Sequence, residues 1–152
     1  MNHCHFVFAT LLACLGAAAH AEVTVKEPWV RATVPAQRAT GAFMQLNASE
    51  DVRVIEVRSP VAKTVELHEM RMDGDKMMMQ ALPWLDLTPS KPVDLKPGGY
   101  HVMLIDLLKP LSAGDKVPLT LVVEGKDKKR STVEISAEVR GLDGRPTMDH
   151  KH

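Results

Sequence analysis

The sequence predicts an all-β domain, a Greek-key sandwich or barrel. Short runs of alternating apolar and polar residues follow one another, and turn residues separate them at intervals of roughly ten residues. No stretch after residue 21 has the hydrophobic period of a helix. The 152 residues suffice for one domain with its own core and are too few for two.

Nine strands are expected in chain order, each bounded by turn or polar residues. They are residues 23–30, 40–47, 52–59, 64–70, 76–82, 92–95, 100–107, 117–124 and 132–140. The sharpest break is Pro97-Gly98, which predicts a type II turn because Gly tolerates the positive φ of the third turn position. Trp84 follows the fifth run, and we expect it in the core.

The first 21 residues are typical of a cleaved export signal. Residues 6–19 are apolar and uncharged, too few to span a bilayer comfortably, and the small-x-small sequence Ala19-His20-Ala21 follows at once. The mature protein would then begin at Glu22, with a β domain over 22–140 and a flexible polar tail over 141–152. In an alternative interpretation, Cys14 is the acylated cysteine of a lipoprotein.

Composition excludes several classes of function. Nineteen basic and nineteen acidic residues give a net charge of zero, which argues against nucleic acid as a partner, and aromatic residues are only 4% of the chain. Both cysteines, Cys4 and Cys14, would leave with the signal peptide. A cysteine-free mature domain has no disulfide, no blue-copper centre and no cysteine zinc site.

Histidine and methionine are placed so that they share faces of the predicted strands. Side chains two residues apart in a strand point the same way. Three such pairs are His68 with Met70, Met77 with Met79, and His101 with Met103. The Asp73-Gly74 turn would join the first two runs as a hairpin and bring the first pair near the second.

These residues also form a spaced pattern. His68 is followed after ten residues by Met79, after twenty-one more by His101, and after one more by Met103. The pattern resembles the signature of the PCuAC family of periplasmic copper chaperones, and the resemblance extends over residues 68–74, 95–104, 107–111 and 114–119. It implies a cupredoxin-like fold. Met70 stands one position beyond the optional Met of the family signature.

The donor types agree with a copper site on chemical grounds alone. Thioethers are soft and do not titrate, and together with imidazole they suit Cu(I) far better than zinc, magnesium or calcium. We therefore expect Cu(I) at His68, Met79, His101 and Met103. Met70 and Met77 are possible auxiliary ligands, whereas Met44, Met72 and Met78 are expected in the core or on the surface.

The tail carries a second, separate signal. Met148, His150 and His152, with a neighbouring carboxylate, could hold Cu(II), so the protein would have two copper sites. The alternative is an unstructured polar end without a metal.

The family resemblance implies a monomeric periplasmic chaperone that delivers copper to cytochrome c oxidase assembly, either to the CuA site or to a Sco-type partner. We expect no membrane span in the mature protein. One alternative is a copper buffer or resistance protein, and another is a structural β domain without metal. We do not expect an enzyme, because neither a cysteine nor paired carboxylates are arranged for catalysis.

Overall fold

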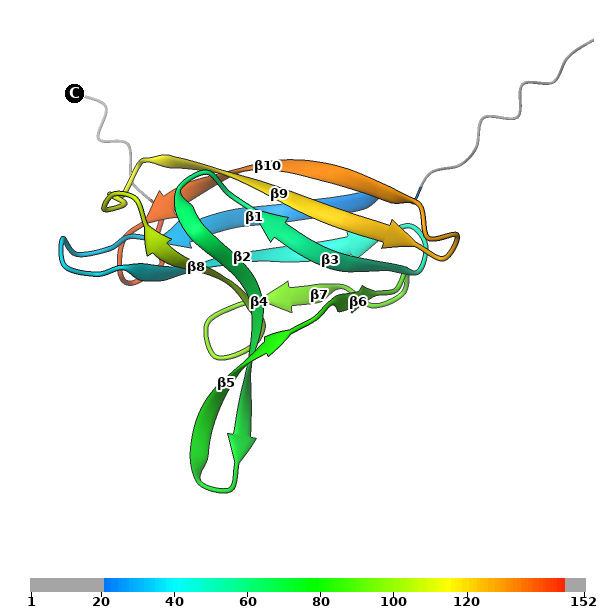
Figure 1. The fold of residues 1–152 in the computed structure, drawn as a ribbon, viewed down its shortest axis with the longest axis horizontal. Helices are drawn as coiled ribbons and strands as arrows, with labels where there is room; N and C mark the ends of the chain where they lie inside the picture. The colour runs from blue at the N-terminus through cyan, green and yellow to red at the C-terminus, as the bar shows by residue number, and fades with distance from the viewer. Residues whose placement is uncertain (1–20, 147–152) are drawn as a thin grey trace, which may run out of the picture.

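The computed structural model describes residues 21–146, and these form strands and turns without a helix (Figure 1). Within this range, then, no helix is available that could cross a membrane. The predicted signal peptide up to residue 20, with Cys4 and Cys14, lies outside the described residues. So do the tail residues Met148, His150 and His152.

The all-β prediction is confirmed, and each of the nine expected strands is present with ends that differ by at most three residues. The strands are β1 (Val23–Arg31), β2 (Ala39–Ala48), β3 (Val52–Arg58), β4 (Ala62–Asp73), β5 (Lys76–Leu82), β6 (Leu85–Leu87), β7 (Val93–Leu95), β8 (His101–Leu107), β9 (Lys116–Gly125) and β10 (Arg130–Arg140). The sequence missed only β6, which at three residues is too short to show alternation.

The strands form one mixed sheet in the order β5-β4-β8-β2-β1-β10-β9-β3-β6, with β7 attached to β2. Every pairing is antiparallel except that of β1 with β10. Leu104 of β8 and Leu119 of β9 are far apart in this order, yet both are fully buried in one core cluster. A flat sheet could not bring them together, so the sheet folds over on itself as a sandwich (Figure 1).

Two turns have the geometry that the sequence predicts. Gly98 has a φ of 86°, and the amide of Gly99 donates to the carbonyl of Lys96 at 3.0 Å, as a type II turn requires. Gly74 has a φ of 62° in the turn that joins β4 to β5. This hairpin projects away from the sandwich (Figure 1).

The expectation for Trp84 is wrong. Its ring is exposed between β5 and β6, and the guanidinium of Arg53 lies 4.8 Å from the ring centroid. Trp84 lies just beyond the end of β5, where alternation no longer places a side chain in the core.

Two leucines, Leu104 within β8 and Leu108 just after it, differ in burial, so their substitution should have different effects. Leu104→Ala should lower the free energy of unfolding by about 2–5 kcal/mol, because it leaves a cavity where the side chain is fully buried. Leu108→Ala, at an exposed position, should change it by no more than about 0.5 kcal/mol. Urea unfolding measures both values, and equal losses would contradict this description of the core.

Candidate metal centre

His68 and His101 lie directly opposite each other on β4 and β8. Their ring centroids are 5.7 Å apart, and the ring planes are inclined at 56°. The sequence neighbours Leu67 and Val102 are also paired and point into the core, so alternation places both imidazoles on the outer face of the sheet.

Glu66 orients the imidazole of His68. The Glu66 carboxylate oxygen Oε2 lies 2.7 Å from His68 Nε2. Because a carboxylate only accepts, Nε2 carries the proton and donates it, and Nδ1 keeps its lone pair. Nδ1 is buried and has no hydrogen-bond partner among the described residues. A buried nitrogen without a partner is costly, and a bound metal would remove that cost.

Gly99 orients the imidazole of His101, but through the other ring nitrogen, Nδ1 instead of Nε2. The ring nitrogen Nδ1 lies 3.2 Å from the Gly99 carbonyl oxygen, so Nδ1 donates and Nε2 keeps the lone pair. Burial lowers the pKa of His101; the hydrogen bond to Gly99 opposes this, and the neighbouring His68 lowers the pKa further. The neutral ring, which is the form that binds metal, is therefore favoured.

The two methionines of the spaced pattern lie on the same outer face. Met103 is opposite Glu66, and His68 is two residues along β4, so Met103 is diagonal to His68. On the other side of β4, Met79 is two residues from Ala81, which pairs with His68, so Met79 is also diagonal to it. The register thus places one donor on each side of the two imidazoles. Met79 is the outermost of the four, with 48% of its surface exposed.

The remaining methionines separate into three groups. Met70 lies opposite Met79, as the predicted hairpin requires, and its amide donates to the Gly99 carbonyl at 3.2 Å. Met77 lies opposite Met72, two residue pairs farther from the histidines than Met70 and Met79. Met44 is in the core, whereas Met72 and Met78 are exposed.

Three further groups that shape the site were not predicted from the sequence. Glu66 could have been found, because it stands two residues before His68 and therefore shares its face. The Gly99 carbonyl and the Phe43 ring had no local signal. Phe43 lies 6.4 Å from the His101 ring and 4.6 Å from the Trp29 ring, centroid to centroid.

Within residues 21–146, histidines, cysteines and carboxylates do not by themselves form a cluster that could bind a metal. No three His, Cys, Asp or Glu side chains come together there in a way that could hold an ion. The thioethers of Met79 and Met103 are the further donors that the register places on the same face as the histidine pair. This agrees with a soft cation and disfavours calcium or magnesium.

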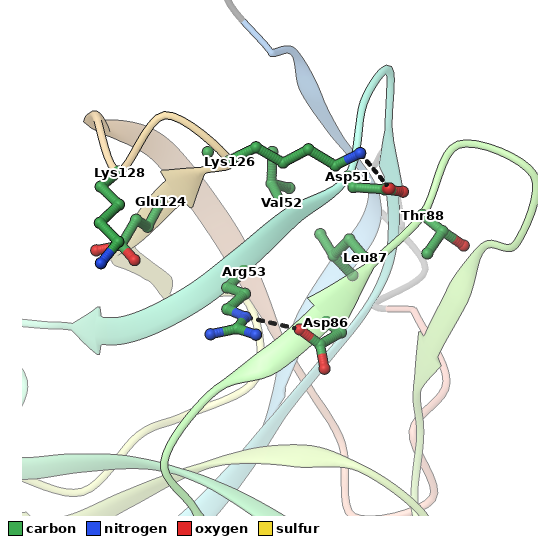
Figure 2. Close-up of a pocket in the computed structure, with 10 residues that line it drawn as sticks. Asp51, Val52, Arg53, Asp86, Leu87, Thr88, Glu124, Lys126 and Lys128 are labelled. Carbon is green, nitrogen blue, oxygen red and sulfur yellow. Dashed lines mark hydrogen bonds and ion pairs between the residues drawn. The ribbon is translucent and has the colours of Figure 1, made fainter.

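A cavity of about 590 Å³ lies elsewhere, between β3, β6 and β9 (Figure 2). Four of its charged side chains form ion pairs: Arg53 with Asp86 at 3.1 Å, and Lys126 with Asp51 at 3.0 Å. Neither histidine nor methionine lines it, so it is not part of the candidate metal centre.

A family model described as "Putative lipoprotein LpqE-like" matches residues 23–139. The chain belongs to the LpqE-like family. Among its relatives, "Putative lipoprotein Lxx21020" of Leifsonia xyli subsp. xyli is 27% identical over 151 residues, covering 91% of this chain and 89% of that protein. "Uncharacterized protein RP573" of Rickettsia prowazekii is 27% identical over 125 residues, covering 78% and 68% respectively.

Solved structures share the fold of this LpqE-like protein. The apo PCuAC domain from PmoF1 superposes with a TM-score of 0.62 at 23% identity, over 80% of this chain and 99% of that domain. The copper-bound PCuAC domain from PmoF2 gives 0.59 at 23% identity, over 80% and 100%. The solution structure of CuI-DR1885 from Deinococcus radiodurans is 32% identical, with a TM-score of 0.58 and 83% of each chain covered. The resemblance to PCuAC proteins is thus supported at the level of fold and family.

The packing beside His101 makes Gly41 a sensitive position. A Cβ on Gly41 would lie 2.7 Å from Cζ of Phe43, whose ring is buried against Trp29. Gly41→Ala should therefore lower the free energy of unfolding by about 1–3 kcal/mol. In urea unfolding, adding Phe43→Leu should recover part of that loss. Strictly additive losses would show that the ring is not the obstacle.

The lowered pKa of His101 predicts how the stability of the apo protein depends on pH. The unfolded chain has the ordinary histidine pKa of about 6.5 and binds a proton before the folded chain does. The free energy of unfolding should therefore fall as the pH drops through 6.5, down to the folded pKa. Urea unfolding at pH 7.5 and pH 5 should show a smaller change for His101→Gln than for the natural chain. An equal change in both proteins would contradict this assignment.

Proposed function

We propose that this protein is a copper chaperone that binds Cu(I) through His68, Met79, His101 and Met103. The observation that carries the proposal is the buried, unpartnered Nδ1 of His68, held beside the imidazole of His101. The copper-bound state of the PmoF2 domain and the Cu(I) form of DR1885 support the choice of metal.

The four donors suit the capture and release of a monovalent ion. His68 offers Nδ1 and His101 offers Nε2, while Glu66 and Gly99 hold the opposite nitrogens. All four donors are uncharged, so the complex would carry a single positive charge beside the Glu66 carboxylate. Copper remains Cu(I) throughout, so the function is binding and ligand exchange without turnover.

The difference in burial suggests an order of release. The two imidazoles are largely covered: the His68 side chain is 12% exposed, and His101 is buried. Met79 is half exposed and supplies a weak thioether bond. An acceptor would therefore displace Met79 first and withdraw the ion from the imidazoles afterwards.

The cellular role follows the family resemblance. We propose an exported protein that delivers copper to cytochrome c oxidase assembly, at the CuA site or through a Sco-type partner, with Cu(II) at the tail as a second site. In this proposal, residues 1–21 are the signal peptide and the domain spans 22–140. The lipoprotein descriptions of the family and of the Leifsonia relative favour the alternative with an acylated Cys14. The N-terminal residue of the exported protein, Glu22 or acylated Cys14, distinguishes the two.

Two adjacent methionines provide a matched test of the ligand set. Met79 and Met78 are 48% and 51% exposed, but alternation along β5 puts them on opposite faces. In an anaerobic Cu(I) titration against a chromophoric chelator, Met79→Leu should weaken affinity about tenfold or more, and Met78→Leu should leave it unchanged. The histidine site of the chain from Glu22 should bind Cu(I) with or without residues 142–152.

Three outcomes separate the alternatives. Equal effects of the two leucine variants would overturn the assignment of Met79. Absence of affinity in the natural chain would leave a structural domain. Tight binding without transfer to an apo acceptor that has a thiolate site would indicate a buffer instead of a chaperone.

A further inference from the structure

The β4–β5 hairpin exposes large apolar side chains that the sandwich does not need. Among the described residues, nine large hydrophobic side chains are exposed, and four of these are the methionines Met72, Met77, Met78 and Met79. None of the four belongs to the core cluster. The hairpin projects from the body of the protein (Figure 1), and each of these four side chains has about half or more of its surface exposed. An exposed apolar cluster of this kind indicates a role other than stability.

The register of the hairpin assembles three of its methionines beyond those proposed for the histidine site. Met72 pairs with Met77, and Met70 pairs with Met79. Because residues two apart share a face, Met70, Met72 and Met77 all lie on the outer face that also carries His68. Cβ atoms of directly opposite residues are about 5 Å apart, and the long, unbranched methionine side chain lets the sulfur atoms converge.

We propose that Met70, Met72 and Met77 form a second soft-metal site that binds Cu(I) or Ag(I) through thioethers alone. A neutral sulfur donor binds a soft monovalent ion and discriminates against harder divalent ions. The carboxylates of the hairpin do not provide an alternative site, since no acidic cluster able to hold a metal occurs within residues 21–146. The site requires no histidine and stands whether or not the histidine site binds copper.

The location of this site gives it a distinct use. Met70 lies opposite Met79, so the thioether site adjoins the outer edge of the proposed histidine site. An ion at the exposed hairpin would lie on the same face, between two and four residue pairs from His68. The hairpin would thus offer a low-barrier entry point, because thioethers exchange one at a time without proton release.

The two sites differ in their response to acid, and this makes them separable. Histidine ligands lose metal as protons compete for their lone pairs, whereas thioethers do not bind protons in this pH range. Ag(I) is a suitable probe because it mimics Cu(I) and is stable in air.

The test is an Ag(I) titration of the chain from Glu22, followed by NMR of ¹³C-labelled methionine methyl groups at pH 7 and pH 5. We expect the methyl groups of Met70, Met72 and Met77 to shift together at both pH values, and to do so again in the His68→Ala/His101→Ala variant. The Met70→Leu/Met72→Leu/Met77→Leu variant should lose this equivalent of Ag(I) and keep the one that shifts Met103. Met78→Leu, on the opposite face, should lose nothing.

Two other results would overturn the hairpin site, and a third would overturn the proposed function alone. If the natural chain shifts only Met79 and Met103, the hairpin holds no metal, although the histidine site stands. If the Met78 methyl shifts in parallel with the other three, binding is unspecific. If the hairpin methionines bind Ag(I) and the His68→Ala/His101→Ala variant binds as many equivalents as the natural chain, the hairpin site stands and the proposed function fails. The first two results are measured on the natural chain. They can therefore be obtained even if a variant does not fold.

Discussion

The candidate site depends on the pairing of β4 with β8. That ladder sets His68 against His101 and, by the same register, Leu67 against Val102. A slip of β4 by one residue would turn His68 into the core and expose Leu67, and His68 would no longer lie beside His101. The hydrophobic effect that fixes the sandwich therefore fixes the geometry of the two imidazoles as well, and no separate element is needed to hold them.

The carbonyl of Gly99 links the loop before β8 to the hairpin. It accepts hydrogen bonds from His101 Nδ1 and from the amide of Met70. The Pro97-Gly98 turn places this carbonyl, and the positive φ of Gly98 makes the turn possible. One backbone oxygen thus selects the tautomer of a proposed ligand and also ties the hairpin to the site. Glu66 plays the corresponding part for His68 through a side chain.

The outer face changes in character along β4. Near the sandwich it carries the covered imidazoles, and toward the turn it carries exposed thioethers. Buried imidazoles in fixed tautomers favour retention of an ion, because their geometry is prepared before it arrives. Exposed thioethers favour exchange, because each bond is weak and each side chain is flexible. The alternation of side chains along β4, paired with β8 on one side and β5 on the other, provides both properties.

Some features of this protein are determined by residues close together in the sequence. Alternation placed nine strands, Asp73-Gly74 set the hairpin that pairs Met70 with Met79, and Pro97-Gly98 set the turn before His101. These features depend on local backbone preferences, which neighbouring residues express by themselves. The spacing of histidine and methionine likewise indicated which side chains to examine.

Only the tertiary structure decided which strands meet. The pairing of β4 with β8, the parallel pair β1 and β10, and the packing of Phe43 beside His101 join segments far apart in the chain. The free nitrogen of each imidazole was equally hidden, because it depends on a carboxylate and a carbonyl that approach only after folding. Each such contact depends on how the whole core packs, and no local run of residues specifies that.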